Sequence, residues 1–166
     1  MHPTQGQPGN QRAHPDAAGA AVEDHGRAVT ASVRAAACYG QAQRALDRPQ
    51  AMTALRLAVE ADPAFELALA DLDAMTGSSG RRHRRGQMNW ERHHIEVVRT
   101  AASGNGQRAA DLLREHLAAV GCDPLAFLIV AQARQPDEMD EDFENLAGRL
   151  PHCHPTRWSA ANHQNG

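Results

Sequence analysis

The sequence predicts an all-α fold built from antiparallel helical hairpins. Hydrophobic residues make up 42% of the 166 residues but aromatic residues only 4%, so alanine and aliphatic side chains would form the core. Such small side chains suit helices that approach closely, and the period-two alternation that marks half-buried strands is hard to find. Apolar residues recur instead at helical spacing, in segments that end at proline or glycine. A mainly β architecture is therefore excluded.

About seven helices are expected from this periodicity. They cover residues 21–46, 49–61, 64–75, 88–102, 107–120, 124–134 and 137–150. Gly26 and Gly40 weaken the first helix, which leaves two shorter pieces as an alternative. Pro49 and Pro124 suit the first turn of a helix, and Asp123 suits the N-cap before Pro124.

The two ends of the chain are expected to lie outside this helical domain of residues 21–150. Residues 1–20 are rich in Pro, Gly, Gln and His and should be disordered, and residues 151–166 should form an extended or disordered tail. The N-terminal segment lacks the apolar stretch of a secretory signal. No apolar run approaches the roughly 20 residues of a membrane helix. We therefore expect a cytoplasmic protein that does not bind membranes.

A repeat pattern links the second and third expected helices. Ala51, Leu55, Ala58 and Pro63 follow the order small, bulky, small and proline that starts a new helical hairpin. The small residues let one helix approach the other, and the proline interrupts the chain before the next hairpin. A looser second copy comprises Gly104, Ala110, Leu113, Leu117 and Pro124.

These residues resemble the tetratricopeptide-repeat (TPR) superfamily. The segment AMTALRLAVEADPAFELALA, residues 51–70, looks like a repeat junction, and residues 90–127 are similar to the bacterial branch of the tetratricopeptide-repeat-protein-38-like family. The resemblance covers roughly residues 32–150, although the aromatic residues of the repeat signature are missing and the chain is much shorter than full-length members. It implies an α-α superhelix or compact bundle whose concave groove binds a peptide or protein segment.

His94 and His116 are the main candidates for chemistry. Each lies on the apolar stripe of its own expected helix, and counting outward from the Gly104-Asn105-Gly106 turn puts both at nearly the same level. They could share a proton, bind a metal, or act as acid and base with Glu91 or Glu115 nearby. The sequence favours the other interpretation, in which each histidine is a core-edge residue whose polar end is satisfied by backbone or by a carboxylate. Arg92 and His94 match an Arg-x-His element in the resembling family, which implies no known catalytic role.

His152, Cys153 and His154 form a second group of metal-ligating residue types. Adjacent residues in an extended stretch point in alternating directions, and a zinc site needs a further pair of ligands, which the sequence does not show. The sequence therefore favours a chance cluster in a tail over a metal site.

A basic run, Arg81, Arg82, His83, Arg84 and Arg85, occupies the loop before residue 88. It could contact an acidic partner, including the acidic side chains of residues 137–144, or could be a solvated loop. The net charge of −3 and the lack of interleaved aromatic residues argue against nucleic-acid binding.

The sequence thus favours a protein-interaction or scaffold module that binds a peptide or protein partner through its groove. Self-association is a further option, because short repeat arrays need additional packing. The alternative is a small helical enzyme that uses His94, His116 and Glu91 for acid-base or metal-assisted chemistry. The sequence carries no cofactor-binding motif, and it leaves open whether the protein is an enzyme.

Overall fold

The computed structural model describes residues 21–22, 27–45, 47–78, 88–134 and 141–148. The elements in chain order are β1 (Ala21–Val22), β2 (Ala28–Val29), α1 (Val33–Gln43), α2 (Arg48–Ala61), α3 (Glu66–Thr76), α4 (Asn89–Ala102), α5 (Gly106–Val120), α6 (Pro124–Ala133) and α7 (Glu141–Gly148). The predicted all-α class is confirmed. The expected disorder of residues 1–20 and 151–166 lies outside the described residues.

Local sequence signals set where most of these helices begin and end. The side chains of Ser32, Asp47, Asn105 and Asp123 each accept a hydrogen bond from a backbone N–H in the first turn of α1, α2, α5 and α6. Such caps satisfy donors that have no partner inside the helix. Gly77 ends α3 with a φ of 71°, a left-handed conformation that favours glycine.

The single helix expected over residues 21–46 is wrong. The chain instead forms the antiparallel pair of β1 and β2, with Ala21 opposite Val29, before α1 begins. Tertiary contacts hold this stretch extended, because Trp90 Nε1 donates to the carbonyl of Ala28 at 3.0 Å. Val33, the first residue of α1, has 79% of its surface exposed.

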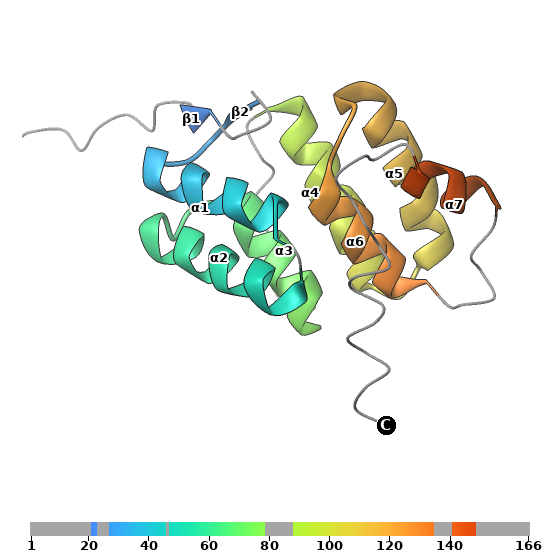
Figure 1. Cartoon of the computed structure of the whole chain (residues 1–166), viewed down its shortest axis with the longest axis horizontal. Coiled ribbons are helices and arrows are strands. Elements are labelled where there is room, and N and C mark those ends of the chain that lie inside the picture. The colour runs from blue at the N-terminus through green and yellow to red at the C-terminus, as the bar shows by residue number, and fades with distance from the viewer. Residues whose placement is uncertain (1–20, 23–26, 46, 79–87, 135–140, 149–166) are drawn as a thin grey trace, which may run out of the picture.

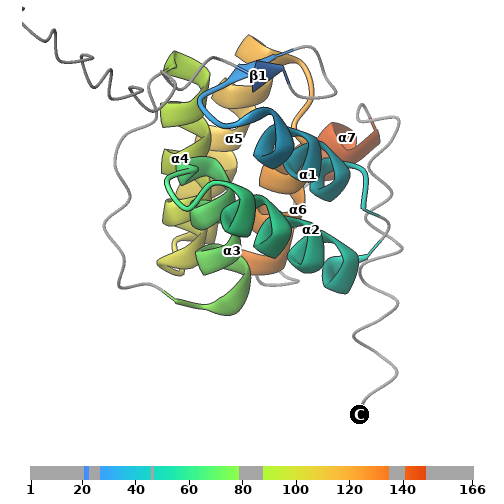
Figure 2. The same cartoon turned by 90° about the vertical axis from the view of Figure 1, so that its left-hand side faces the viewer.

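The helices form a compact bundle rather than a row of repeats. Figure 1 shows α1, α2 and α3 on one side of the molecule and α4, α5, α6 and α7 on the other, and Figure 2 views the bundle from the side of α1 to α3. Helix α1 packs on α2, and α4 packs on α5, as two hairpins. Helix α6 contacts α1 and α3 as well as α4 and α5, whereas a repeat in an open solenoid contacts only its neighbours.

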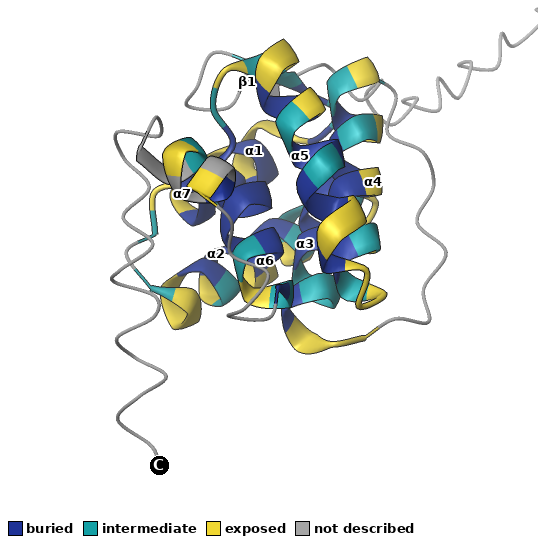
Figure 3. Cartoon of the chain, turned by 90° about the vertical axis from the view of Figure 1, so that its right-hand side faces the viewer, coloured by how far each residue is buried: buried dark blue, intermediate teal, exposed yellow. Residues whose placement is uncertain are grey.

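The core is apolar and rich in alanine. Ala35, Ala51 and Ala58 are fully buried between α1 and α2, and every residue of α6 from Pro124 to Val130 is buried. Figure 3 shows the buried faces of the helices turned inward and the exposed residues on their outer faces. Among the described residues, each helix is too short or too polar to cross a membrane.

Candidate functional site

Four ionisable side chains meet inside the bundle: Asp71 of α3, His94 of α4, His116 of α5 and Asp123, the N-cap of α6. We call them the carboxylate–histidine cluster. Each has 0% of its surface exposed. Buried charges are costly unless they are paired and hydrogen-bonded, so the contacts within the cluster decide what it can do.

His94 lies between the two carboxylates. Its Nδ1 is 2.7 Å from Asp123 Oδ2, and its Nε2 is 2.7 Å from Asp71 Oδ1. Both ring nitrogens therefore donate, which makes the ring an imidazolium. Burial alone would lower the pKa of His94, but the charges of Asp71 and Asp123 and the hydrogen bonds to them outweigh it and raise the pKa to about 10.

His116 is the neutral member of the cluster. Its Nε2 donates to Asp123 Oδ2 at 2.9 Å, while its Nδ1 is buried without a hydrogen-bond partner among the described residues. Burial lowers the pKa of His116, and Asp123 only partly opposes that effect. The ring thus keeps a bare Nδ1 lone pair inside the protein, close to His94, whose ring centroid is 5.8 Å away.

Asp123 connects the cluster to the backbone of α6. Its Oδ1 accepts from the N–H of Ala126 at 3.2 Å and from Gln43 Nε2 at 3.2 Å. The amide oxygen of Gln43 accepts from the N–H of Leu125, so α1 also caps α6. Burial would raise the pKa of Asp123, but the charge of His94 and the histidine hydrogen bonds hold it well below its usual value.

Two further side chains surround the cluster. The hydroxyl of Tyr39 donates to Asp71 Oδ2 at 2.9 Å. Arg27 Nη1 lies 4.0 Å from Asp123 Oδ2, and its guanidinium stacks on the ring of Trp90 at 4.6 Å from the ring centre. Positive and negative groups therefore alternate through the interior of the bundle.

The structure brings His94 and His116 together but places Glu91 and Arg92 elsewhere. Glu91 is buried, and its carboxylate accepts from the N–H of Thr30 at 2.6 Å and from the N–H of Met88 at 3.1 Å. It therefore anchors the segment before α1 to the start of α4. Arg92 is exposed and donates to Asn89 on the surface.

The other predicted site residues lie outside the described residues. They are Arg81, Arg82, Arg84, Arg85, His152, Cys153 and His154. Partner binding by the basic run and metal binding by the tail group therefore stay predictions.

Sequence reasoning missed Asp71, Tyr39 and Gln43. A signal for Asp71 does exist, because it shares a helix face with the buried Leu67 and Met75, four residues before and after it. A charged residue on an apolar stripe requires a buried partner. The partner itself, His94, lies on another helix and could not be assigned from spacing.

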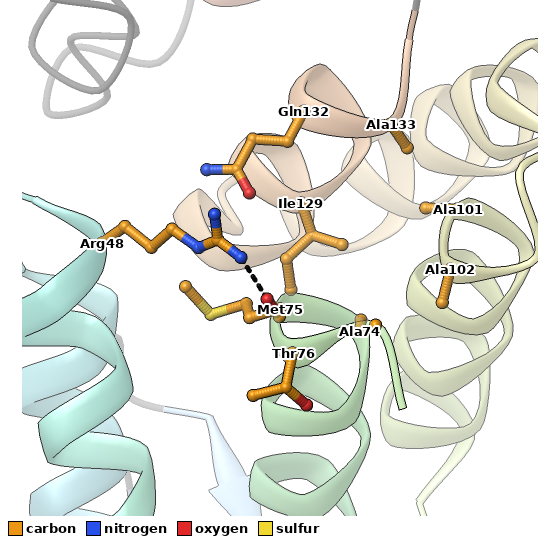
Figure 4. Close-up of a pocket in the computed structure, with 10 residues that line it drawn as sticks. Arg48, Ala74, Met75, Thr76, Ala101, Ala102, Ile129, Gln132 and Ala133 are labelled. Atoms are coloured by element: carbon orange, nitrogen blue, oxygen red, sulfur yellow. Dashed lines mark hydrogen bonds between the residues drawn. The ribbon is translucent and has the colours of Figure 1, made fainter. Parts of the chain in front are cut away.

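A second feature is an open cavity of about 490 Å³ at one end of the bundle. Its walls come from the C-terminal ends of three helices and from the first residue of α2 (Figure 4). The lining residues are Arg48 of α2, Ala74, Met75, Thr76 and Gly77 at the end of α3, Ala101 and Ala102 of α4, and Ile129, Gln132 and Ala133 of α6. We call it the helix-end cavity. The guanidinium of Arg48 projects into it and donates to the carbonyl of Met75.

The two features offer different chemistry. The carboxylate–histidine cluster could transfer protons or ligate a cation, but its residues are sealed from solvent and do not line the helix-end cavity. The helix-end cavity is open, and the carbonyl of Met75 at its wall accepts from Arg48. Comparison of the chain with protein-family models, with curated proteins and with solved structures gave no match. The resemblance to tetratricopeptide-repeat proteins stays a prediction.

Proposed function

We propose that the protein is an interaction module that binds a lysine- or arginine-bearing segment of a partner protein in the helix-end cavity. The observation that carries this proposal is the convergence of the C-terminal ends of α3, α4 and α6 around one open cavity. The sequence favoured a protein-binding role, and this cavity supplies a concave surface for it.

Electrostatics favour a cationic occupant. The last carbonyls of each helix lack partners within the helix, and the helix dipole places partial negative charge at that end. A cation near one helix C-terminus gains roughly 0.3–1 kcal/mol. Three helix ends that converge would add their effects, and the small side chains of Ala74, Ala101 and Ala102 take up little of the cavity.

Arg48 supports the same conclusion from inside the chain. Its guanidinium already binds the carbonyl of Met75. Because Arg48 is exposed, its side chain can turn toward solvent when a partner's side chain enters. The cavity can thus accept a guanidinium or ammonium group of a partner, which would replace the guanidinium of Arg48.

The enzymatic alternative, with His94, His116 and Glu91 as the working groups, has less support. All three side chains are buried. Glu91 is committed to backbone N–H groups near Thr30 and Met88. A substrate would need access to His94 and His116, and a general acid or base must come within hydrogen-bond reach of the atom it serves.

Peptide display against the full chain tests the binding function. We expect the enriched peptides to carry lysine or arginine, and replacing that residue by alanine to weaken binding about tenfold. The substitution Ala102→Phe fills the rim of the helix-end cavity and should abolish binding.

Thr53→Phe is the matched control, because Thr53 is exposed and lines a different cavity, between α1 and α2. Enriched peptides without basic residues would refute the proposal. Equal binding by the Ala102→Phe variant would do the same.

A further inference from the structure

The carboxylate–histidine cluster has the residues and the spacing of a metal centre. His94, His116 and Asp123 each offer one ligand atom, and these atoms lie within 4.8 Å of one another. They come from three separate elements, α4, α5 and the N-cap of α6. Two imidazole nitrogens and one carboxylate oxygen form a ligand set that suits Zn²⁺.

The surroundings of His94 and Asp123 match those of a built metal site, whereas His116 Nδ1 has no hydrogen-bond partner among the described residues. Metal-ligating histidines usually donate their other ring nitrogen to a carboxylate, and His94 Nε2 already does so to Asp71 Oδ1 at 2.7 Å. Asp123 is oriented in the same way, since its Oδ1 is held by Gln43 and by the backbone of Ala126. Its Oδ2 therefore points at the two histidines.

We propose that the cluster binds one Zn²⁺ ion through His94 Nδ1, His116 Nε2 and Asp123 Oδ2. The site lies away from the helix-end cavity, so it is independent of the proposed peptide binding. Three protein ligands leave one tetrahedral position, which a water molecule would fill. Because the three side chains are buried, the ion would tie α4, α5 and α6 together.

The protons balance in this step. The ion replaces the proton that His94 Nδ1 donates to Asp123, and that proton leaves to solvent. His116 must free its Nε2, and its bare Nδ1 receives the proton, so the ring changes tautomer without changing charge. The two negative charges of Asp71 and Asp123 then balance the two positive charges of the ion, and Arg27, 4.0 Å from Asp123 Oδ2, adds one positive charge beside them.

Arg27 does not hydrogen-bond to Asp123 Oδ2, the oxygen that would coordinate the ion. Its Nη1 lies 4.0 Å from Asp123 Oδ2, which is beyond hydrogen-bonding distance, and its guanidinium rests on the face of Trp90. Coordination of Asp123 therefore breaks no hydrogen bond to Arg27.

Zinc content after refolding tests the proposal. The full chain first receives His152→Gln, Cys153→Ser and His154→Gln, so that the tail group cannot bind metal. This protein is unfolded, refolded with ZnCl₂ because the site is closed, desalted, and analysed for zinc by mass spectrometry. We expect about one zinc ion per chain, and its binding should raise the free energy of unfolding.

Variants in the same background assign the ligands. His116→Gln should lose the ion, and Asp71→Asn should weaken binding about 10- to 100-fold, because Asp71 orients His94 without touching the metal. The control is His93→Gln on α4, which should keep one ion per chain, because the His93 ring lies edge-on to His116 but offers no ligand atom to the site.

Two results would overturn the proposal. The first is a refolded tail variant that unfolds cooperatively yet holds no stoichiometric zinc. The second is zinc retained at one ion per chain by His116→Gln. If His116→Gln does not fold, cobalt loading of the tail variant decides the question, because two imidazoles and a carboxylate around Co²⁺ give a visible absorption band that a chain without the site lacks. Peptide binding is measured separately, so either proposal can fail alone.

Discussion

The α1–α2 hairpin and the α4–α5 hairpin have the same architecture but different interiors. Between α1 and α2 the buried side chains include Ala35, Ala51, Leu55 and Ala58, which pack without polar groups of their own. Between α4 and α5 the interface buries His94, whose nitrogens bind partners on neither helix. The contact between α1 and α2 is mainly apolar, with one polar link from the N–H of Ser32 to Asp62, whereas the α4–α5 interface depends on groups from α3 and α6.

This difference concerns cooperativity as well as packing. A small-residue interface stabilises two neighbouring helices whatever lies beyond them. The carboxylate–histidine cluster joins four elements, so the loss of one member leaves buried partners unpaired on the others. Substitutions in the cluster and in the α1–α2 hairpin test this contrast.

Asp123→Ala should have the largest effect. It removes the cap of α6 and leaves His94, His116 and Gln43 without their shared partner. We expect the free energy of unfolding to fall by about 3–5 kcal/mol, measured by urea denaturation. Asp123→Asn, which keeps a capping oxygen, should recover part of the loss.

Asp111→Ala is the control for this substitution. Asp111 is 45% exposed and pairs with Arg114 on the surface, so its loss should cost less than about 1 kcal/mol. Equal destabilisation by the two substitutions would show that the cluster does not hold the helices together.

Leu55→Ala tests the apolar hairpin. Leu55 is fully buried in α2, so truncation leaves a void beside the small residues of α1, and we expect a loss of about 3 kcal/mol. This loss should not depend on pH. Leu57→Ala, on the same helix at 41% exposure, should change stability by less than about 0.5 kcal/mol. A comparable loss in both variants would contradict the assigned packing.

Stability should fall with rising pH in the chain treated with a chelator. The pKa of His94 is raised from 6.5 to about 10, so the folded state keeps a proton that the unfolded state releases near 6.5. The stabilisation is complete below pH 6.5 and is lost as the pH rises through 10. Between pH 7 and 9 the free energy of unfolding should drop by up to about 1.4 kcal/mol per pH unit.

The groups that face His94 do not cancel this slope. The pKa of His116 is lowered, so its protonation changes the stability only at pH values below 6.5. Asp71, Asp123 and Tyr39 supply the carboxylates and the hydroxyl around His94. His94→Gln should abolish the slope, and a flat profile for the unmutated chain would rule out the buried imidazolium.

Much of the fold could be predicted from the sequence, but only half of the cluster. The start of α6 at Asp123-Pro124 and the end of α3 at Gly77 follow from the local sequence. Counting outward from the Gly104–Gly106 turn places His94 and His116 at the same height on the two helices of their hairpin. The stretch before α1 was misread, because its extended form depends on Trp90 and Glu91, which lie about sixty residues away. Asp71 and Gln43 were missed for the same reason.

The helical class, the alanine-rich contacts and most helix boundaries follow from the sequence, since they depend on residues within a few positions of each other. Only the tertiary structure decided that α6 crosses the bundle and that its N-cap, Asp123, faces two histidines. The physical reason is that a buried charge is governed by whatever group lies within hydrogen-bonding distance. Helical periodicity predicts which face of a helix carries such a group, but it does not predict which residue of another helix will contact it.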